Sequence, residues 1–140
     1  GEIFGFLGPN GAGKTTTIHI LMNFIHPTRG QAMIHGLPIY NSKCREQVGF
    51  LPELFEFDKF LKGKKLLKYL GDLAGVPSKQ IQAKGRELLE FFEMADAEGR
   101  KVKTYSKGMK QKIGLAQAMI SDPDLLILDE PTSGMDPIAK

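Results

Sequence analysis

Residues 8–16 read Gly-Pro-Asn-Gly-Ala-Gly-Lys-Thr-Thr, a glycine-rich run between an apolar segment and a helical pattern. Residues 3–7 form a short apolar run that predicts a buried strand. The residues that predict one apolar helix face after the run, at i, i+3, i+4 and i+7, are Ile18, Leu21, Met22 and Ile25. Strand, glycine-rich loop and helix follow one another in the order that a phosphate-binding loop requires, so the fold class is predicted as α/β.

The spacing of Gly8, Gly13, Lys14 and Thr15 matches the P-loop pattern. Glycines let backbone N–H groups close around phosphate oxygens, lysine adds a positive charge, and threonine offers a hydroxyl to Mg²⁺. The alternative, a plain glycine-rich turn, is disfavoured by the flanking elements. The predicted nucleotide-binding residues of this loop are Gly8, Asn10, Gly11, Gly13, Lys14, Thr15 and Thr16.

Composition limits the other possibilities. The 140 residues suffice for one domain, and a net charge of +3 is too small to indicate nucleic acid or an anionic membrane as a partner. The sequence has neither an apolar run of membrane-spanning length nor the layout of a signal peptide. A single cysteine, Cys44, excludes an internal disulfide and fits a reducing compartment, so the cytoplasm is predicted. The chain opens without methionine and stops just after a motif, and we expect a fragment that lacks both ends.

Two short strands are predicted at residues 31–35 and 48–51, and residues 62–99 carry two helical patterns broken at residues 75–78. The first helix bears Lys62, Lys64, Lys65 and Lys68. These lysines fit either an acidic partner or a solvated helix face, and the solvated face is favoured.

The second half of the chain ends in an acidic pair. Ser106 has the residue type of a helix N-cap, and the pattern that follows predicts a helix to about residue 121. Residues 125–128 are aliphatic, as in a parallel strand buried on both faces, and Asp129 and Glu130 follow directly. Ligands of open α/β sheets gather at that edge, so the pair and the P-loop are expected to face one nucleotide. Asp129 is a candidate Mg²⁺ ligand and Glu130 the candidate group that polarises the attacking water; a solvated turn is the alternative.

Residues 105–109, Tyr-Ser-Lys-Gly-Met, resemble the Leu-Ser-Gly-Gly-Gln signature of the ABC (ATP-binding cassette) ATPases, and residues 133–136, Ser-Gly-Met-Asp, resemble that family's D-loop. The motifs occur in family order over nearly the whole chain. The resemblance implies a P-loop NTPase core with a mostly parallel sheet, a small antiparallel edge sheet and an α-helical subdomain at about residues 58–121. Residues 1–140 are then a partial nucleotide-binding domain.

The same resemblance implies function. It predicts an ATPase that uses ATP and Mg²⁺, pairs head to tail with a second ABC ATPase domain as a homodimer or heterodimer, and powers a transmembrane permease, most like drug or antibiotic exporters. Ser106 and Gly108 would contact ATP held by the partner's P-loop, and Glu130 would be catalytic. The protein would be cytoplasmic and peripheral to the membrane through the permease, with no nucleic acid partner.

Departures from the family pattern are also visible. Glu53 follows Pro52 where most members carry glutamine; its oxygen can serve Mg²⁺, but its charge leaves its role open. In the signature, Tyr105, Lys107 and Met109 replace leucine, glycine and glutamine. The family's adenine-stacking aromatic and switch histidine are expected outside the chain, so the fragment itself is expected to be catalytically incomplete.

Three phenylalanines, Phe55, Phe57 and Phe60, fit either a surface for the permease or helical core, and both readings stay open. A second functional hypothesis is a soluble ABC-type ATPase of translation or DNA maintenance. The absence of a long insertion between Thr15 and Ser106 disfavours its coiled-coil type. A third, a P-loop GTPase or kinase, leaves the signature and D-loop unexplained.

Overall fold

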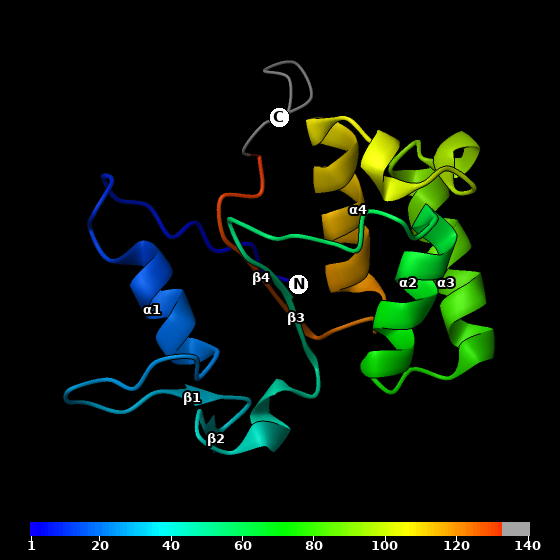
Figure 1. Cartoon of the computed structure of the whole chain (residues 1–140). Coiled ribbons are helices and arrows are strands. Elements are labelled where there is room, and N and C mark those ends of the chain that lie inside the picture. The colour runs from blue at the N-terminus through cyan, green and yellow to red at the C-terminus, as the bar shows by residue number, and fades with distance from the viewer. Residues whose placement is uncertain (133–140) are drawn as a thin grey trace. The chain divides into compact units, whose positions relative to one another are not determined.

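The computed structural model describes residues 1–132 and divides the chain into two compact units, Gly1–Val48 and Gly49–Lys140 (Figure 1). Each unit is described by itself. The D-loop candidate at residues 133–136 lies outside the described residues.

The first unit contains one helix and one small hairpin. Helix α1 spans Lys14–Leu21, and β1 (Met33–Ile34) pairs antiparallel with β2 (Leu37–Pro38), followed by the 3₁₀ helix Ser42–Arg45. The hairpin turns at His35 and Gly36, with φ of 51° and 73°. Two consecutive positive φ values are typical of the tight turns whose twist matches a hairpin. The predicted strand at residues 31–35 is therefore confirmed only at its centre, because His35 belongs to the turn.

The prediction of a buried strand at residues 3–7 is wrong. These residues form no strand, and Ile3, Phe4 and Leu7 are 100%, 82% and 90% exposed. An apolar run supplies side chains for a core but no hydrogen-bonding neighbour. Among the described residues of the first unit, the complete paired strands are only two residues long. A buried strand needs partners along its whole length.

The predicted helix after the glycine-rich loop is confirmed but shorter than its apolar pattern. It ends at Leu21 with Met22 as C-cap, and Asn23 takes a left-handed φ of 59°. Ile18 is buried, whereas Ile25 lies beyond the helix and is 40% exposed. The left-handed residue breaks the helical backbone before the last apolar position.

The second unit holds a two-stranded sheet, β3 (Val48–Leu51) beside β4 (Leu125–Leu128), with β3 beginning at the unit boundary. The Asp129 N–H donates to the Leu51 carbonyl over 2.9 Å, so the carboxyl ends of both strands lie at one edge and the pair is parallel. Both strand predictions are confirmed in their bounds. The prediction that β4 is buried on both faces is wrong: Leu126 is 36% exposed, because β3 alone flanks β4 among the described residues.

Three helices make the core of this unit: α2 (Gly63–Leu73), α3 (Ser78–Phe91) and α4 (Lys107–Met119), joined by 3₁₀ helices Ala95–Ala97 and Val102–Thr104. Helices α2 and α3 lie side by side, and α4 packs on both (Figure 1). The buried cluster includes Leu66, Leu67, Ile81, Leu88, Leu89 and Ile113. The predicted break between the first two helices is confirmed, with Gly75 at φ 74° ending α2 and Pro77 as N-cap of α3.

Helix α4 also packs closely on strand β3. A Cβ at Gly49 would lie 2.0 Å from the Ala118 carbonyl oxygen, and one at Gly114 would lie 2.9 Å from the Leu51 Cδ1. The Gln117 side chain donates to the Phe50 carbonyl over 2.9 Å. Glycine on each element allows this approach, which fixes α4 beside the strand that pairs with β4.

Candidate functional site

The glycine-rich loop forms a turn that ends at the N-terminus of α1. Gly11 and Gly13 take φ values of 80° and 91°, and Gly13 is the N-cap. The conformation is left-handed, which explains glycine at both positions. The Lys14 Nζ donates to the carbonyls of Gly8 (2.9 Å) and Pro9 (3.2 Å), so the ammonium group lies over the loop.

This geometry suits an anion. The first turn of α1 carries no acidic side chain, and its free N–H groups and the positive end of the helix dipole lie beside the Lys14 charge. The Thr17 hydroxyl donates to the Gly13 carbonyl over 2.9 Å and strengthens the start of the helix. Of the predicted loop residues, Gly8, Asn10, Gly11, Gly13, Lys14, Thr15 and Thr16 all lie in the loop or the first turn of α1.

In the second unit, three predicted residues follow the carboxyl ends of the two paired strands. Glu53 follows the carboxyl end of β3, and Asp129 and Glu130 follow that of β4. Asp129 is 3% exposed, and its Oδ2 makes no hydrogen bond within the described residues. A buried carboxylate oxygen without a partner is costly, so a ligand there has a physical reason to bind. Glu53 and Glu130 are exposed.

The carboxylates at this edge of the sheet suit a Mg²⁺ ion that brings its other ligands with it. Within residues 1–132, no group of three or more histidine, cysteine, aspartate or glutamate side chains gathers to hold a metal ion. Mg²⁺ is commonly bound by one or two carboxylates, with waters and substrate phosphates completing its shell. The orphaned Oδ2 of Asp129 therefore fits an ion that arrives with a nucleotide.

The signature segment is held at the start of α4. Ser106 is the predicted N-cap, and the structure confirms it: its Oγ accepts from the Met109 N–H over 3.2 Å. A Cβ added at Gly108 would meet no atom within 4 Å, so there is open space beside the backbone at this position. A cavity of about 590 Å³ adjoins both residues, and its charged lining balances Arg100 and Lys112 against Glu93 and Asp96, with Lys112 paired to Glu93 at 3.5 Å. Helix α4 ends at Met119 instead of about residue 121, since Asp122 takes a left-handed φ of 53°.

Tyr105, the residue that replaces the signature leucine, has a structural role that the sequence analysis missed. It is 5% exposed, and its hydroxyl donates to the Ala97 carbonyl over 2.7 Å. A Cβ at Gly63 would lie 2.1 Å from that hydroxyl, so glycine is needed there. Burial raises the pKa of the Tyr105 phenol above its ordinary value. Its anchoring bond therefore depends on a protonated hydroxyl.

Gln111 is a second residue whose role we did not predict from the sequence. Its side chain is buried in α4, and its Nε2 donates to the Pro131 carbonyl over 2.8 Å, one residue past Glu130. The available signal was its spacing: it precedes Gly114 by three residues and Ala118 by seven, on a helix face that packs on β3.

Of the three phenylalanines, two pack against helices and one is exposed. Phe57 packs against the helical core, and Phe55 lies against α4 at Gly114. The two rings are 5.0 Å apart. Phe60 is 72% exposed, with the Lys103 Nζ 5.8 Å from its ring centre. Only Phe60 has the exposure that a docking surface requires.

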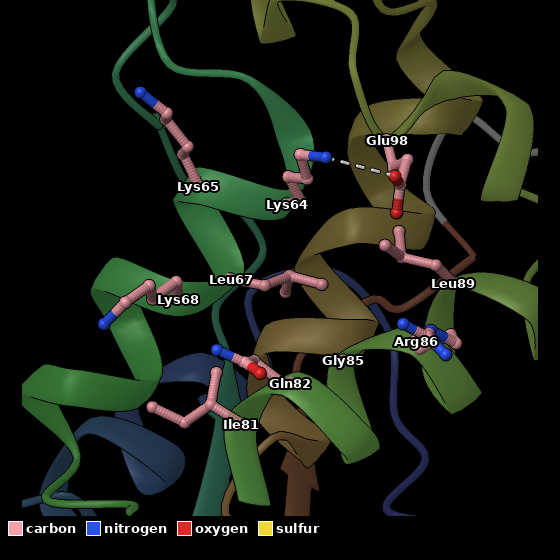
Figure 2. A pocket seen from close by; sticks show the side chains of 10 residues that line it. All are labelled: Lys64, Lys65, Leu67, Lys68, Ile81, Gln82, Gly85, Arg86, Leu89 and Glu98. Atoms are coloured by element: carbon pink, nitrogen blue, oxygen red, sulfur yellow. Dashed lines mark hydrogen bonds and ion pairs between the residues drawn. The ribbon is translucent and has the colours of Figure 1, made fainter. Parts of the chain in front are cut away.

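The lysine-rich face of α2 borders a cavity of about 350 Å³ between α2 and α3 (Figure 2). Lys64 is paired with Glu98 at 3.3 Å and Lys68 with Asp72 at 2.7 Å. The lysine side chains do not converge on one point in Figure 2; Lys64 points to Glu98, while Lys65 and Lys68 extend away from it. This arrangement is typical of a solvated helix face, where such pairs contribute little to stability.

The P-loop residues belong to the first unit, and the acidic and signature residues to the second. In a comparison with known proteins, one family model covers residues of both units. The family model described as ABC transporter matches residues 1–133. The chain belongs to the ABC transporter family.

Curated relatives match this chain over its whole length. An uncharacterised ABC transporter ATP-binding protein of Nostoc sp. is 40% identical over 142 residues, covering 100% of this chain and 42% of the relative. The Nod factor export ATP-binding protein I of Burkholderia lata is 39% identical over 142 residues, covering 100% of this chain and 47% of the relative. The ABC chain thus spans less than half the length of these two relatives.

Solved structures confirm the predicted fold class. One titled as the ATP binding subunit of an ABC transporter has a TM-score of 0.83 and 31% identity, covering 95% of this chain and 56% of that one. A putative ABC transporter ATP-binding protein from Pyrococcus furiosus has a TM-score of 0.78 and 28% identity, covering 94% and 64%. The fold is that of the ABC ATPase domain, a P-loop NTPase. No helix among residues 1–132 is long and apolar enough to cross a membrane.

Proposed function

We propose that this chain is part of the ATP-binding and ATP-hydrolysing subunit of an ABC transporter. The observation that carries the proposal is the loop at α1, where the Lys14 Nζ lies 2.9 Å from the Gly8 carbonyl above a left-handed Gly11 and Gly13. Such a loop surrounds phosphate oxygens with N–H donors and one mobile positive charge. The family match and relatives named ATP-binding proteins support ATP as the nucleotide.

Hydrolysis is assigned to the acidic pair. Asp129, whose Oδ2 is buried and unpartnered, would serve Mg²⁺, with the Thr15 hydroxyl and Glu53 as further candidates. When bound, Mg²⁺ neutralises charge on the phosphates. The exposed Glu130 carboxylate would accept a hydrogen bond from the attacking water and align it.

The Ser106 hydroxyl, the open backbone at Gly108 and the N-terminus of α4 form the second half-site of the proposal. Free N–H groups there would bind the γ-phosphate of ATP held by the P-loop of a second ABC ATPase domain. Two domains paired head to tail would then share each nucleotide, and hydrolysis would release them. The helical subdomain at about residues 58–121 would carry this half-site.

Export is the proposed direction. Relatives 39–40% identical are named Nod factor export ATP-binding proteins, which favours an exporter over a soluble ABC ATPase of translation or DNA maintenance. The membrane partner would be a permease, with the exposed Phe60 as a candidate contact. The protein would then act in the cytoplasm at the membrane.

The test is nucleotide titration of the natural full-length protein with a fluorescent ATP analogue. Lys14→Ala removes a charge-assisted contact, so we expect affinity to fall about 10- to 100-fold. Lys43→Ala, an exposed lysine of the same unit, is the matched control and should bind as the wild type does. Unchanged affinity in Lys14→Ala would reject the phosphate-binding assignment.

A further inference from the structure

We infer that Gln111 is a positioning residue for Glu130 and sets the direction of its carboxylate. The inference rests on the proposed function, since it concerns the hydrolytic step. It joins two observations: the buried hydrogen bond from Gln111 to Pro131, and the left-handed backbone of Glu130 immediately before Pro131.

Glu130 has a φ of 50°, a conformation that L side chains adopt at a cost of about 1 kcal/mol. Such a conformation persists only where the surrounding structure holds it. Within the described residues, the Glu130 carboxylate itself makes no hydrogen bond or ion pair. The restraint must therefore act on the backbone at either side.

Two hydrogen bonds supply that restraint. Before Glu130, the Asp129 N–H donates to the Leu51 carbonyl over 2.9 Å. After it, the Gln111 Nε2 donates to the Pro131 carbonyl over 2.8 Å. Proline has no N–H, so its carbonyl is the one backbone hydrogen-bonding group available at position 131. Glu130 is thus held between an anchor on β3 and an anchor on α4.

The α4 anchor is rigid. Gln111 is 5% exposed, and a hydrogen bond shielded from water is stronger than one at the surface. Its helix is fixed to β3 by the close approaches at Gly49 and Gly114. The same helix begins at the signature serine, Ser106, so one rigid element contacts both the proposed second half-site and the catalytic turn.

Loss of the Gln111 hydrogen bond should affect the rate of hydrolysis and not the binding of ATP. Loss of the Gln111 bond would let the turn relax and move the Glu130 carboxylate, while the phosphate-binding loop in the other unit would be unchanged. A displacement of about 1 Å in an aligning group costs on the order of 100-fold in rate. The expected signature is a fall in kcat without a change in ATP affinity.

The experiment uses the full-length protein with Gln111→Met, which keeps the side-chain length and removes the donor. Gln117→Met is the matched control, because Gln117 lies on the same helix and makes a similar bond, 2.9 Å to the Phe50 carbonyl, within β3 and not to the turn that follows β4. We expect kcat to fall about 10- to 100-fold in Gln111→Met alone. Both variants should keep the wild-type dissociation constant for ATP and lose similar thermal stability.

A double-mutant cycle separates positioning from general damage. In a Glu130→Gln background, Gln111→Met should lower the residual single-turnover rate less than two-fold, since the group that it positions is absent. Equal losses of kcat in the two methionine variants, or full additivity with Glu130→Gln, would overturn the inference while leaving the ATPase assignment intact. Lack of ATP turnover by the wild type would instead overturn the proposed function, and this inference with it.

Discussion

The Asp129 N–H donates a hydrogen bond of 2.9 Å to the carbonyl oxygen of Leu51, the last residue of β3. This bond extends the ladder between β3 and β4 by one residue beyond the end of β4. It directs the Asp129 backbone into the sheet while the side chain remains buried with an unpartnered Oδ2. Glu53, two residues beyond Leu51, is brought to the same edge.

Glu130→Gln should separate binding from hydrolysis. The amide keeps the size of the side chain but cannot accept the proton of the attacking water, so we expect turnover to fall at least about 100-fold with ATP affinity unchanged. Phosphate release and nucleotide titration of the full-length protein measure the two quantities. Size-exclusion chromatography with ATP should show a stable dimer. Continued phosphate release together with a monomer would show that Glu130 is not the key carboxylate.

Asp129→Asn should lose activity without losing stability. Replacing a buried, unpartnered carboxylate oxygen by a neutral group removes a desolvation cost, so the melting temperature without nucleotide should stay equal or rise. The Mg²⁺ concentration for half-maximal turnover should rise at least about 10-fold, because a hard anionic ligand is lost. Asp124→Asn, exposed just before β4, is the control for the charge change. Wild-type Mg²⁺ dependence in Asp129→Asn would contradict the assignment.

Ser106→Arg tests the second half-site. The bulky side chain would fill the open space before Gly108, so ATPase activity should be lost while binding to the P-loop of the same chain is retained. Loss of the cap should also cost about 1 kcal/mol of unfolding free energy. Ser106→Thr keeps the hydroxyl and should retain both cap and turnover. The model of shared sites fails if Ser106→Arg hydrolyses ATP at the wild-type rate.

Tyr105→Phe should destabilise the helical core. It deletes the 2.7 Å bond to the Ala97 carbonyl, and we expect a loss of about 1–2 kcal/mol in urea unfolding at pH 7. Burial raises the pKa of Tyr105 above its ordinary value of 10.0, so its contribution is complete below about pH 10 and is lost as pH rises through the raised pKa. The difference between wild type and variant should therefore narrow above pH 10. A constant difference up to pH 11 would contradict this linkage.

Gly49→Ala should disrupt the packing of α4 on β3. The added Cβ would lie 2.0 Å from the Ala118 carbonyl oxygen, which is backbone and cannot rotate away. Overpacking of this kind typically costs about 1–3 kcal/mol, and more where backbone must move. Gly99→Ala is the control, since its Cβ would meet nothing within 4 Å. Equal melting temperatures for the two variants would refute the close approach.

The sequence predicted those features that depend on local chemistry. Glycine spacing identified the turn for which we propose phosphate binding, and its Gly11 and Gly13 do adopt positive φ. Helical periodicity and residue type identified α2, α3, α4 and the Ser106 cap. Residue order gave the family resemblance, which the match over residues 1–133 confirms. Each signal lies within a few residues along the chain, or in the order of such signals.

Two predictions of burial failed, because burial depends on neighbouring elements. The apolar run at residues 3–7 predicted a buried strand but lies exposed, and Leu126 of β4 is more exposed than its aliphatic run suggested. The hydrophobicity of a segment indicates which of its side chains can be buried. Whether they are buried depends on the surfaces that other elements supply.

The sequence alone determined which groups this protein offers: a lysine on a glycine-rich loop, a serine at a helix start, and two carboxylates after a strand. The tertiary structure decided how the carboxylates are held. Leu51 and Gln111 lie 78 and 20 residues before Asp129 and Pro131, whose backbone groups they bind, and the Tyr105 hydroxyl donates to the Ala97 carbonyl eight residues earlier. No local pattern specifies such pairs, because hydrogen bonds between distant segments form only when packing of α4 on β3 has brought the donors and acceptors together.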